Sequence, residues 1–198
     1  MISALQPTTH LLYLHGFRSS PLSTKAQKMA AWMRERGPDV VWCCPQLPPS
    51  PREAIDRLDR LMANWPAAGR AVVGSSLGGF YATVLAERFG CRAVLLNPAV
   101  VPARDLASQI GEHSEWHGGD SFHFEPRYID ELRHLTPPAI TAPSRYFAVI
   151  AKGDEVLDWR EMQARYAGCR IELIEGGDHA LSDFDRHLPA ITGFLAIG

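Results

Sequence analysis

The stretch VVGSSLGGFYA, residues 72–82, joins an apolar run to a second apolar run through two serines flanked by glycines. The branched residues before Gly74 favour a buried strand, and LGGFYATVLAERF, which begins at Leu77, favours a helix. The two patterns meet within three residues, so the chain must turn sharply between them. Ser76 is the serine at the centre of a G-x-S-x-G motif, because Gly74 and Gly78 lie two residues before and after it.

Short apolar runs alternate with amphipathic segments along the rest of the chain. Several have apolar residues at consecutive positions, which is typical of strands buried on both faces of a parallel sheet. The strand that leads to Ser76 spans residues 70–75, and the further strand candidates span residues 10–16, 40–44, 92–98, 145–154 and 169–177. Strands and helices in alternation predict a doubly wound α/β domain, in which ligands bind beyond the carboxyl ends of the strands.

Local start and stop signals place helices between these strands. The stretch SPRE, residues 50–53, combines a capping hydroxyl, a proline at the first helical position and a glutamate three residues after the cap. An earlier helix, over about residues 22–36, should stop before a Gly-Pro pair. Further helices are expected over about residues 159–166 and from residue 184 onward, with Pro189 breaking or restarting the last one.

The segment between about residues 102 and 143 is less regular. We expect an insertion between two strands there, with a small cap as the form it could take and a helix near residues 128–135. No repeat, linker or low-complexity tract divides the sequence, so we predict a single domain over residues 1–198.

The composition is that of a globular protein, with 198 residues of which 46% are hydrophobic and 21% charged. A net charge of -2 gives no reason to expect nucleic acid as a partner. The initial MISALQPTTH lacks the basic and apolar regions of a signal peptide, and we expect no membrane insertion. The cysteines form no CxxC pair, so we expect reduced thiols in a cytoplasmic protein; they are Cys43, Cys44, Cys91 and Cys169.

A serine that acts as a nucleophile needs a base to take its proton and an acid to orient that base. Where the motif occurs at a strand-to-helix turn, the order along the chain is serine, acid, histidine. Of the eight histidines, His179 alone follows a late strand, in the stretch IEGGDHA. Asp154 is the favoured acid because it follows an apolar strand and a glycine, and Asp158 and Asp105 are the second and third candidates. The alternative for Ser76 is a serine that only caps the helix.

The same turn predicts where negative charge on a substrate oxygen would be held. The backbone N–H of Leu77, the residue after the serine, should be one donor. A second should come from the turn HGF, residues 15–17, which follows the first strand, and we expect the N–H of Phe17 to supply it. The alternative for this turn is an ordinary strand end.

The sequence resembles the α/β-hydrolase superfamily and, within it, small bacterial esterases of the YqiA type. The stretches that carry the resemblance are YLHGFRSSPLSTKA, VGSSLGGFYAT, LLNPAV, EPRYIDEL, GDEVLDWR and GGDHALSDFDRHLPAI. The resemblance implies a minimal three-layer α/β-hydrolase fold, with a mostly parallel sheet of about six or seven strands and helices on both faces. It also implies activity on small acyl esters or thioesters. The site residues that it implies are the triad of Ser76, Asp154 and His179 and the oxyanion-hole amides of Phe17 and Leu77.

These observations predict a serine hydrolase that cleaves small acyl esters through an acyl-enzyme intermediate, with no cofactor and no metal. One alternative is an acyl-CoA thioesterase with the same triad, for which Arg18 is the candidate phosphate contact. Another is a non-catalytic binding protein with the same fold. A metal hydrolase would need ligands whose spacing matches no zinc signature, namely His113, His117 and His123 with Glu112, Glu115 or Asp120.

The aromatic residues of the insertion are Trp116, Phe122 and Phe124. We expect them to pack the insertion against the rest of the protein, with a role as pocket lining as the alternative.

Overall fold

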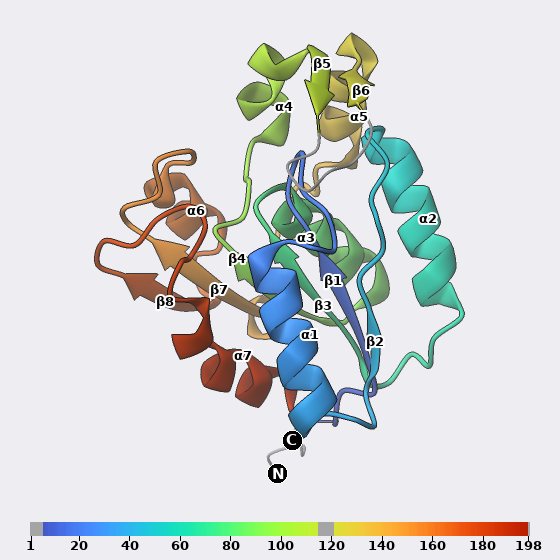
Figure 1. Ribbon diagram of the computed structural model, residues 1–198, viewed down its shortest axis with the longest axis vertical. Coiled ribbons are helices and arrows are strands. Elements are labelled where there is room, and N and C mark those ends of the chain that lie inside the picture. The colour runs from blue at the N-terminus through green and yellow to red at the C-terminus, as the bar shows by residue number, and fades with distance from the viewer. Residues whose placement is uncertain (1–5, 115–120, 198) are drawn as a thin grey trace.

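The computed structural model describes residues 6–114 and 121–197, and a six-stranded parallel sheet lies at its centre (Figure 1). The strands are β1 (His10–Leu14), β2 (Val41–Cys43), β3 (Arg70–Ser75), β4 (Arg92–Leu96), β7 (Tyr146–Ala151) and β8 (Arg170–Ile174). Each falls within a run of residues that the sequence predicts as a strand. The α/β architecture with a parallel sheet is therefore confirmed.

The direction in which strands are added reverses between β1 and β3. The spatial order is β2-β1-β3-β4-β7-β8, so the chain runs outward from β1 to β2 and then returns to the other side of β1. In a doubly wound sheet, a crevice opens at such a reversal, beyond the carboxyl ends of the two strands. The turn after β1 and the turn after β3 therefore meet at one crevice.

Helices cover both faces of the sheet (Figure 1). One face carries α1 (Thr24–Arg36) and α7 (Leu188–Leu195), and the other carries α2 (Pro51–Ala63), α3 (Leu77–Phe89) and α6 (Trp159–Arg165). The helix α5 (Pro126–Leu135) extends the core on the second of these faces and packs against α2. Successive strand residues alternate between two hydrophobic cores, so that Val73 packs on the α1 side and Val72 on the α3 side. Because both faces are covered, the inner strands are apolar at consecutive positions.

The residues predicted to begin and end helices do so in the structure. Ser50 Oγ accepts a hydrogen bond of 3.1 Å from the backbone N–H of Glu53 at the start of α2. Gly37 ends α1. Pro189 lies in the first turn of α7, after the short 3-10 turn η3 (Phe184–Arg186), so this proline begins a helix instead of interrupting one. No helix in the described residues combines the length and hydropathy that a bilayer span requires.

The segment between β4 and β7 contains more regular structure than the sequence predicts. It comprises α4 (Pro102–Asp105), the 3-10 turns η1 (Ala107–Gln109) and η2 (Pro143–Arg145), α5, and an antiparallel hairpin of β5 (Gly111–Ser114) and β6 (Ser121–Phe124). Figure 1 shows α4 and the hairpin at the top of the view, beyond the carboxyl ends of the sheet strands. The sequence did not predict the hairpin, because four-residue strands of mixed polarity carry too little periodicity.

Candidate active site

Ser76 lies in the turn between β3 and α3 with φ of 55° and ψ of −121°, a conformation that residues with side chains rarely adopt. A Cβ atom on Gly74 would lie 2.1 Å from the carbonyl oxygen of Gly78, and one on Gly78 would lie 2.1 Å from that of Leu14. The first turn of α3 therefore touches the backbone of β3 and β1. A side chain at either glycine would force these elements apart, which explains the spacing of the motif.

The side chains of Ser76, His179 and Asp154 form a continuous chain of hydrogen bonds. Ser76 Oγ is 3.0 Å from His179 Nε2, and His179 Nδ1 is 2.7 Å from Asp154 Oδ2. A carboxylate only accepts hydrogen bonds, so the ring proton is on Nδ1 and Nε2 can accept a proton from the serine. The side chain of Asp154 is fully buried, whereas that of His179 is 19% exposed and accessible from the crevice.

The structure brings only one of the three candidate acids to His179. Asp154 Oδ1 accepts two backbone N–H bonds of 2.8 Å from the turn that follows it, and this orients Oδ2 toward the imidazole. Asp158 caps α6 by accepting a hydrogen bond of 2.9 Å from a backbone N–H, and Asp105 pairs with a neighbouring arginine. The favoured acid of the sequence analysis is therefore the one in contact with the histidine.

Asn97, directly after β4, links the histidine loop to the sheet, and the sequence analysis did not single it out. The residue is completely buried and adopts φ of 42°. Its Oδ1 accepts a hydrogen bond of 2.8 Å from Ala151 N–H, and its Nδ2 donates to the carbonyls of Asp178 at 3.0 Å and His179 at 3.2 Å. A signal was present in the sequence, namely an asparagine at the carboxyl end of a buried strand.

Lys25, in the first turn of α1, contacts the same loop. Its Nζ donates a hydrogen bond of 2.5 Å to the carbonyl of Ala180. Burial lowers the pKa of Lys25 to about 8, and the negative charges of Asp178 and Asp154 limit that lowering. The loop that carries the histidine is thus held by side chains from two other elements.

The turn after β1 passes directly beside the serine. A Cβ atom on Gly16 would lie 3.2 Å from Ser76 Cβ. In the described part of the chain, the amides of Phe17 and Leu77 donate no hydrogen bond to another residue. Leu77 is also the first residue of α3, where the helix dipole adds partial positive charge. Both predicted amides are therefore close to the serine and unpaired.

Aromatic contacts fasten this turn to the β5–β6 hairpin. The ring of Phe17 packs edge-on against His113, Phe122 and Phe124, with centroid distances of 5.4, 6.0 and 5.2 Å. The next residue, Arg18, donates a hydrogen bond of 3.1 Å from Nε to a carbonyl of β5. Packing of the insertion against the rest of the protein, expected for Phe122 and Phe124, is confirmed for both.

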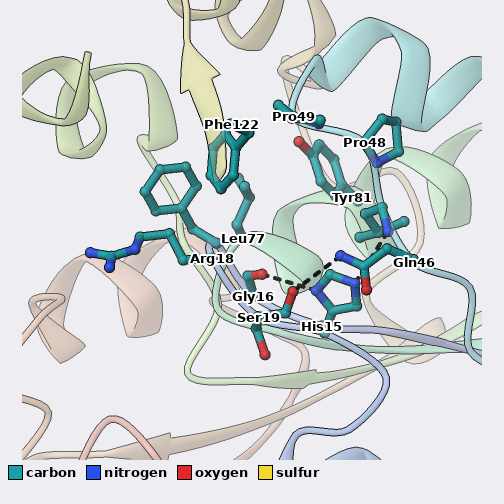
Figure 2. A pocket seen from close by; sticks show the side chains of 12 residues that line it. His15, Gly16, Arg18, Ser19, Gln46, Pro48, Pro49, Leu77, Tyr81 and Phe122 are labelled. Atoms are coloured by element: carbon teal, nitrogen blue, oxygen red, sulfur yellow. Dashed lines mark hydrogen bonds between the residues drawn. The ribbon is translucent and has the colours of Figure 1, made fainter. Parts of the chain in front are cut away.

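A pocket of about 400 Å³, including the space at its mouth, adjoins the two amides (Figure 2). His15 joins two of the loops that enclose it, because its Nδ1 lies 3.1 Å from the carbonyl of Gly16 and its Nε2 accepts a hydrogen bond of 3.2 Å from a backbone N–H. The apolar part of the lining consists of Phe17, Leu47, Pro48, Pro49, Leu77, Tyr81 and Phe122. Phe122 therefore packs the insertion and also lines the pocket.

The remaining residues that the sequence suggested for a site lie away from Ser76 or outside the residues that the structure describes. His113 contacts the carbonyl of Gln109, and His123 pairs with Glu112. Among the residues that the structure describes, no group of histidine, cysteine and acidic side chains is placed to hold a metal ion. The four cysteines are free thiols. The candidates outside the described residues are Glu115, Trp116, His117 and Asp120.

Comparison with solved structures shows that the chain has the α/β-hydrolase fold. Alpha/beta hydrolase domain-containing protein 10 from mouse matches with a TM-score of 0.68 at 15% identity, covering 94% of this chain and 88% of that one. Est1E from Butyrivibrio proteoclasticus, in a structure with ferulic acid bound, matches with a TM-score of 0.64 at 14% identity, covering 96% and 87%.

The sequence assigns the chain to a family within this fold. It belongs to the family described as "Uncharacterised protein family (UPF0227)", whose model matches residues 10–196. UPF0227 protein YE1706 from Yersinia enterocolitica is 24% identical over 196 residues, which cover 95% of this chain and 99% of that protein. The resemblance expected from the sequence is thus confirmed.

Proposed function

We propose that this protein is a serine hydrolase that cleaves small acyl esters through an acyl-enzyme intermediate. The observation that carries the proposal is the hydrogen-bonded chain from Ser76 through His179 to Asp154, at 3.0 and 2.7 Å. Two amides beside the serine, which have no acceptor among the residues that the structure describes, add to it, because a nucleophile alone does not stabilise the charge that develops on the substrate.

In the first half of the reaction, Ser76 Oγ attacks the ester carbonyl carbon while His179 Nε2 takes its proton. The carbonyl electron pair moves to the oxygen, which accepts hydrogen bonds from the amides of Phe17 and Leu77. Each such donor contributes about 3 kcal/mol of transition-state stabilisation. The imidazolium then gives its proton to the leaving alcohol as the C–O bond breaks, and Asp154 stabilises its positive charge throughout.

In the second half, water attacks the acyl-enzyme. His179 takes a proton from the water, the same two amides hold the oxyanion, and the imidazolium returns the proton to Ser76 as the carboxylic acid leaves. No step needs a cofactor.

The comparisons are in keeping with this reaction class. Est1E, which shares the fold, is described with ferulic acid bound, and a carboxylic acid is what ester hydrolysis releases. Thioesters are a second substrate class, favoured by one observation: Arg18 lines the pocket beside the oxyanion turn, where a cation could meet the phosphates of an acyl-CoA. Parallel assays with 4-nitrophenyl esters and acyl-CoAs of equal chain length separate the two classes.

A fluorophosphonate probe tests the proposal, because labelling requires an activated serine. We expect the wild-type protein to be labelled and to hydrolyse 4-nitrophenyl acetate, and Ser76→Ala to lose labelling and at least about 10⁴-fold in kcat. Ser75→Ala is the matched control, since Ser75 is adjacent and buried but lies outside the hydrogen-bonded chain. A wild-type protein that is neither labelled nor active would leave the non-catalytic binding protein as the interpretation.

A further inference from the structure

Tyr81 combines burial with a hydroxyl group that has no hydrogen-bond partner among the described residues. The residue is 2% exposed and lines the pocket beside the oxyanion amides. Within residues 6–114 and 121–197, its hydroxyl makes no hydrogen bond, whereas the equally buried Tyr166 bonds to Thr83 at 2.8 Å. The hydroxyl of Tyr13 is also unpaired but is sealed inside the core, while that of Tyr81 borders the pocket. A ligand in the pocket can therefore reach the hydroxyl of Tyr81.

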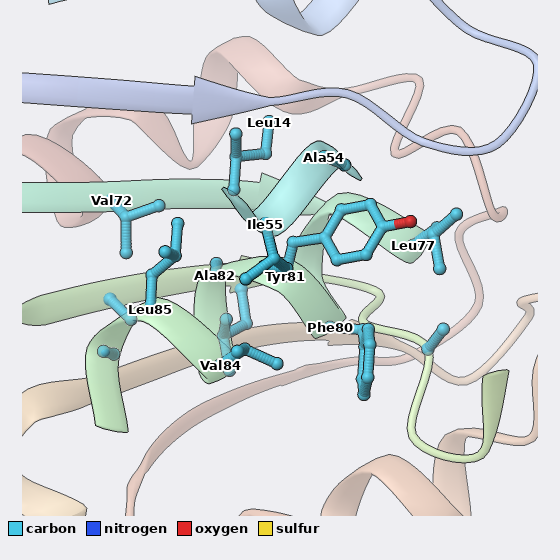
Figure 3. Close-up of a cluster of buried hydrophobic side chains, with 14 of the residues drawn as sticks. Leu14, Ala54, Ile55, Val72, Leu77, Phe80, Tyr81, Ala82, Val84 and Leu85 are labelled. Atoms are coloured by element: carbon cyan, nitrogen blue, oxygen red, sulfur yellow. The ribbon is translucent and has the colours of Figure 1, made fainter. Parts of the chain in front are cut away.

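The geometry of α3 directs the side chain of Tyr81 toward the amino end of the helix, where Leu77 lies. Tyr81 lies four residues after Leu77, so the two side chains share one face of the helix, about 6 Å apart along its axis. Helical side chains lean toward the amino end of their helix. Figure 3 shows the ring of Tyr81 extending back toward Leu77, and Figure 2 shows Tyr81 among the side chains that line the pocket. Tyr81 therefore lines the same pocket as Phe17 and Leu77, whose amides are the proposed oxyanion donors.

The order of the strands decides which part of an ester enters this pocket. His179 and Asp154 follow β8 and β7, which lie on the β4 side of β3. The loops that enclose the pocket follow β1 and β2, on the opposite side of β3. Because the imidazole gives its proton to the leaving group, the leaving group must face His179. The acyl group then extends in the other direction, into the pocket.

We propose that the pocket binds the acyl group and that the Tyr81 hydroxyl selects acyl chains that carry a hydrogen-bonding oxygen beyond the ester carbonyl. This inference rests on the proposed function. An alkyl chain would displace water from the hydroxyl and leave it unpaired, whereas a hydroxyl or carbonyl oxygen on the chain restores the hydrogen bond. Burial raises the pKa of Tyr81, and the charge of Glu131 adds to this, so the group keeps its proton and can donate it.

Pairs of 4-nitrophenyl esters with acyl groups of matched shape test the selection. Suitable pairs are 3-hydroxybutanoate with 3-methylbutanoate, 4-oxopentanoate with 4-methylpentanoate, and (4-hydroxyphenyl)acetate with (4-methylphenyl)acetate. The leaving group is constant, so a difference in kcat/KM within a pair reports on the acyl pocket. We expect the wild type to favour the oxygen-bearing ester in at least one pair by about three- to tenfold.

Tyr81→Phe should abolish this preference by raising kcat/KM for the alkyl ester, lowering it for the polar ester, or both. Tyr166→Phe is the matched control, because it removes a buried tyrosine hydroxyl outside the pocket, and it should keep the wild-type preference. An active enzyme without a preference in any pair, or a preference that survives in Tyr81→Phe, overturns the inference and leaves the proposed function intact. An enzyme that hydrolyses no ester and takes up no fluorophosphonate overturns both.

Discussion

The hydrogen bonds of Asn97 hold the loop that carries His179, and replacing this residue should lower both the free energy of unfolding and the rate of catalysis. Asn97→Ala removes three hydrogen bonds of 2.8 to 3.2 Å. The buried N–H of Ala151 loses its partner, which costs about 1–3 kcal/mol. Alanine at φ of 42° costs about 1 kcal/mol more. The carbonyls of Asp178 and His179 are in a half-buried loop and can bond to water instead. We expect the free energy of unfolding to fall by about 2–4 kcal/mol.

The loss of kcat should be large because the imidazole must lie within hydrogen-bond distance of Ser76. A displacement of about 1 Å in an active site can cost about 100-fold in rate. We therefore expect kcat for 4-nitrophenyl acetate to fall about 100-fold in Asn97→Ala, with KM within about threefold of wild type. Asn97→Asp should lose a similar factor, since its second oxygen would face two carbonyl oxygens where the amide now donates.

Thr83→Val is the matched control for this prediction. Thr83 is 2% exposed and its hydroxyl bonds to Tyr166 at 2.8 Å, but it does not contact the histidine loop. Its replacement should cost about 1–2 kcal/mol of stability and leave kcat unchanged. Urea denaturation gives the stabilities, and initial rates at a temperature where all variants are folded give kcat. An Asn97→Ala protein that is destabilised but retains wild-type kcat would refute the positioning role.

Three further predictions concern the turn, the histidine loop and the hairpin. Gly78→Ala places a Cβ 2.1 Å from a β1 carbonyl and should lower the Tm measured by circular dichroism by about 6–12 °C, while Gly193→Ala, with no atom within 4 Å, should not lower it. Burial lowers the pKa of Lys25 from 10.5 to about 8, so the unfolded chain binds more protons between these values and wild-type stability rises with pH there. At pH 7, Lys25→Met should have a free energy of unfolding that is higher than that of the wild type by up to about 3 kcal/mol, and this difference should shrink toward pH 10.5. Urea titrations measure it. If the free energies of unfolding of wild type and variant depend on pH in the same way, the charge of Lys25 is not destabilising in the folded state. Phe122→Ala removes a pocket wall and a ring contact with Phe17, and should raise KM for 4-nitrophenyl butanoate several-fold; an unchanged KM would show that the hairpin does not bind the acyl group.

Much of the fold and the positions of the candidate site residues were predictable, for identifiable reasons. The inner strands are covered on both faces, so their apolar runs stand out in the sequence. The glycines around Ser76 leave no room for a side chain, because a Cβ atom at Gly74 or Gly78 would lie 2.1 Å from a backbone carbonyl oxygen. His179 was the only histidine after a late strand. The β5–β6 hairpin escaped prediction because its strands are short and its stability comes from contacts with Phe17 and α5, not from its own pattern.

The sequence by itself determined the parallel sheet, its covering helices and the turn that exposes Ser76, because periodicity and glycine sterics are properties of neighbouring residues. Only the tertiary structure decided which carboxylate meets His179, that Asn97 holds the histidine loop through hydrogen bonds, and that the hydroxyl of Tyr81 has no partner among the described residues at the pocket. These features depend on the distances between loops that follow different strands. Such distances are set by the packing of the whole sheet and its helices, and no local pattern in the chain encodes them.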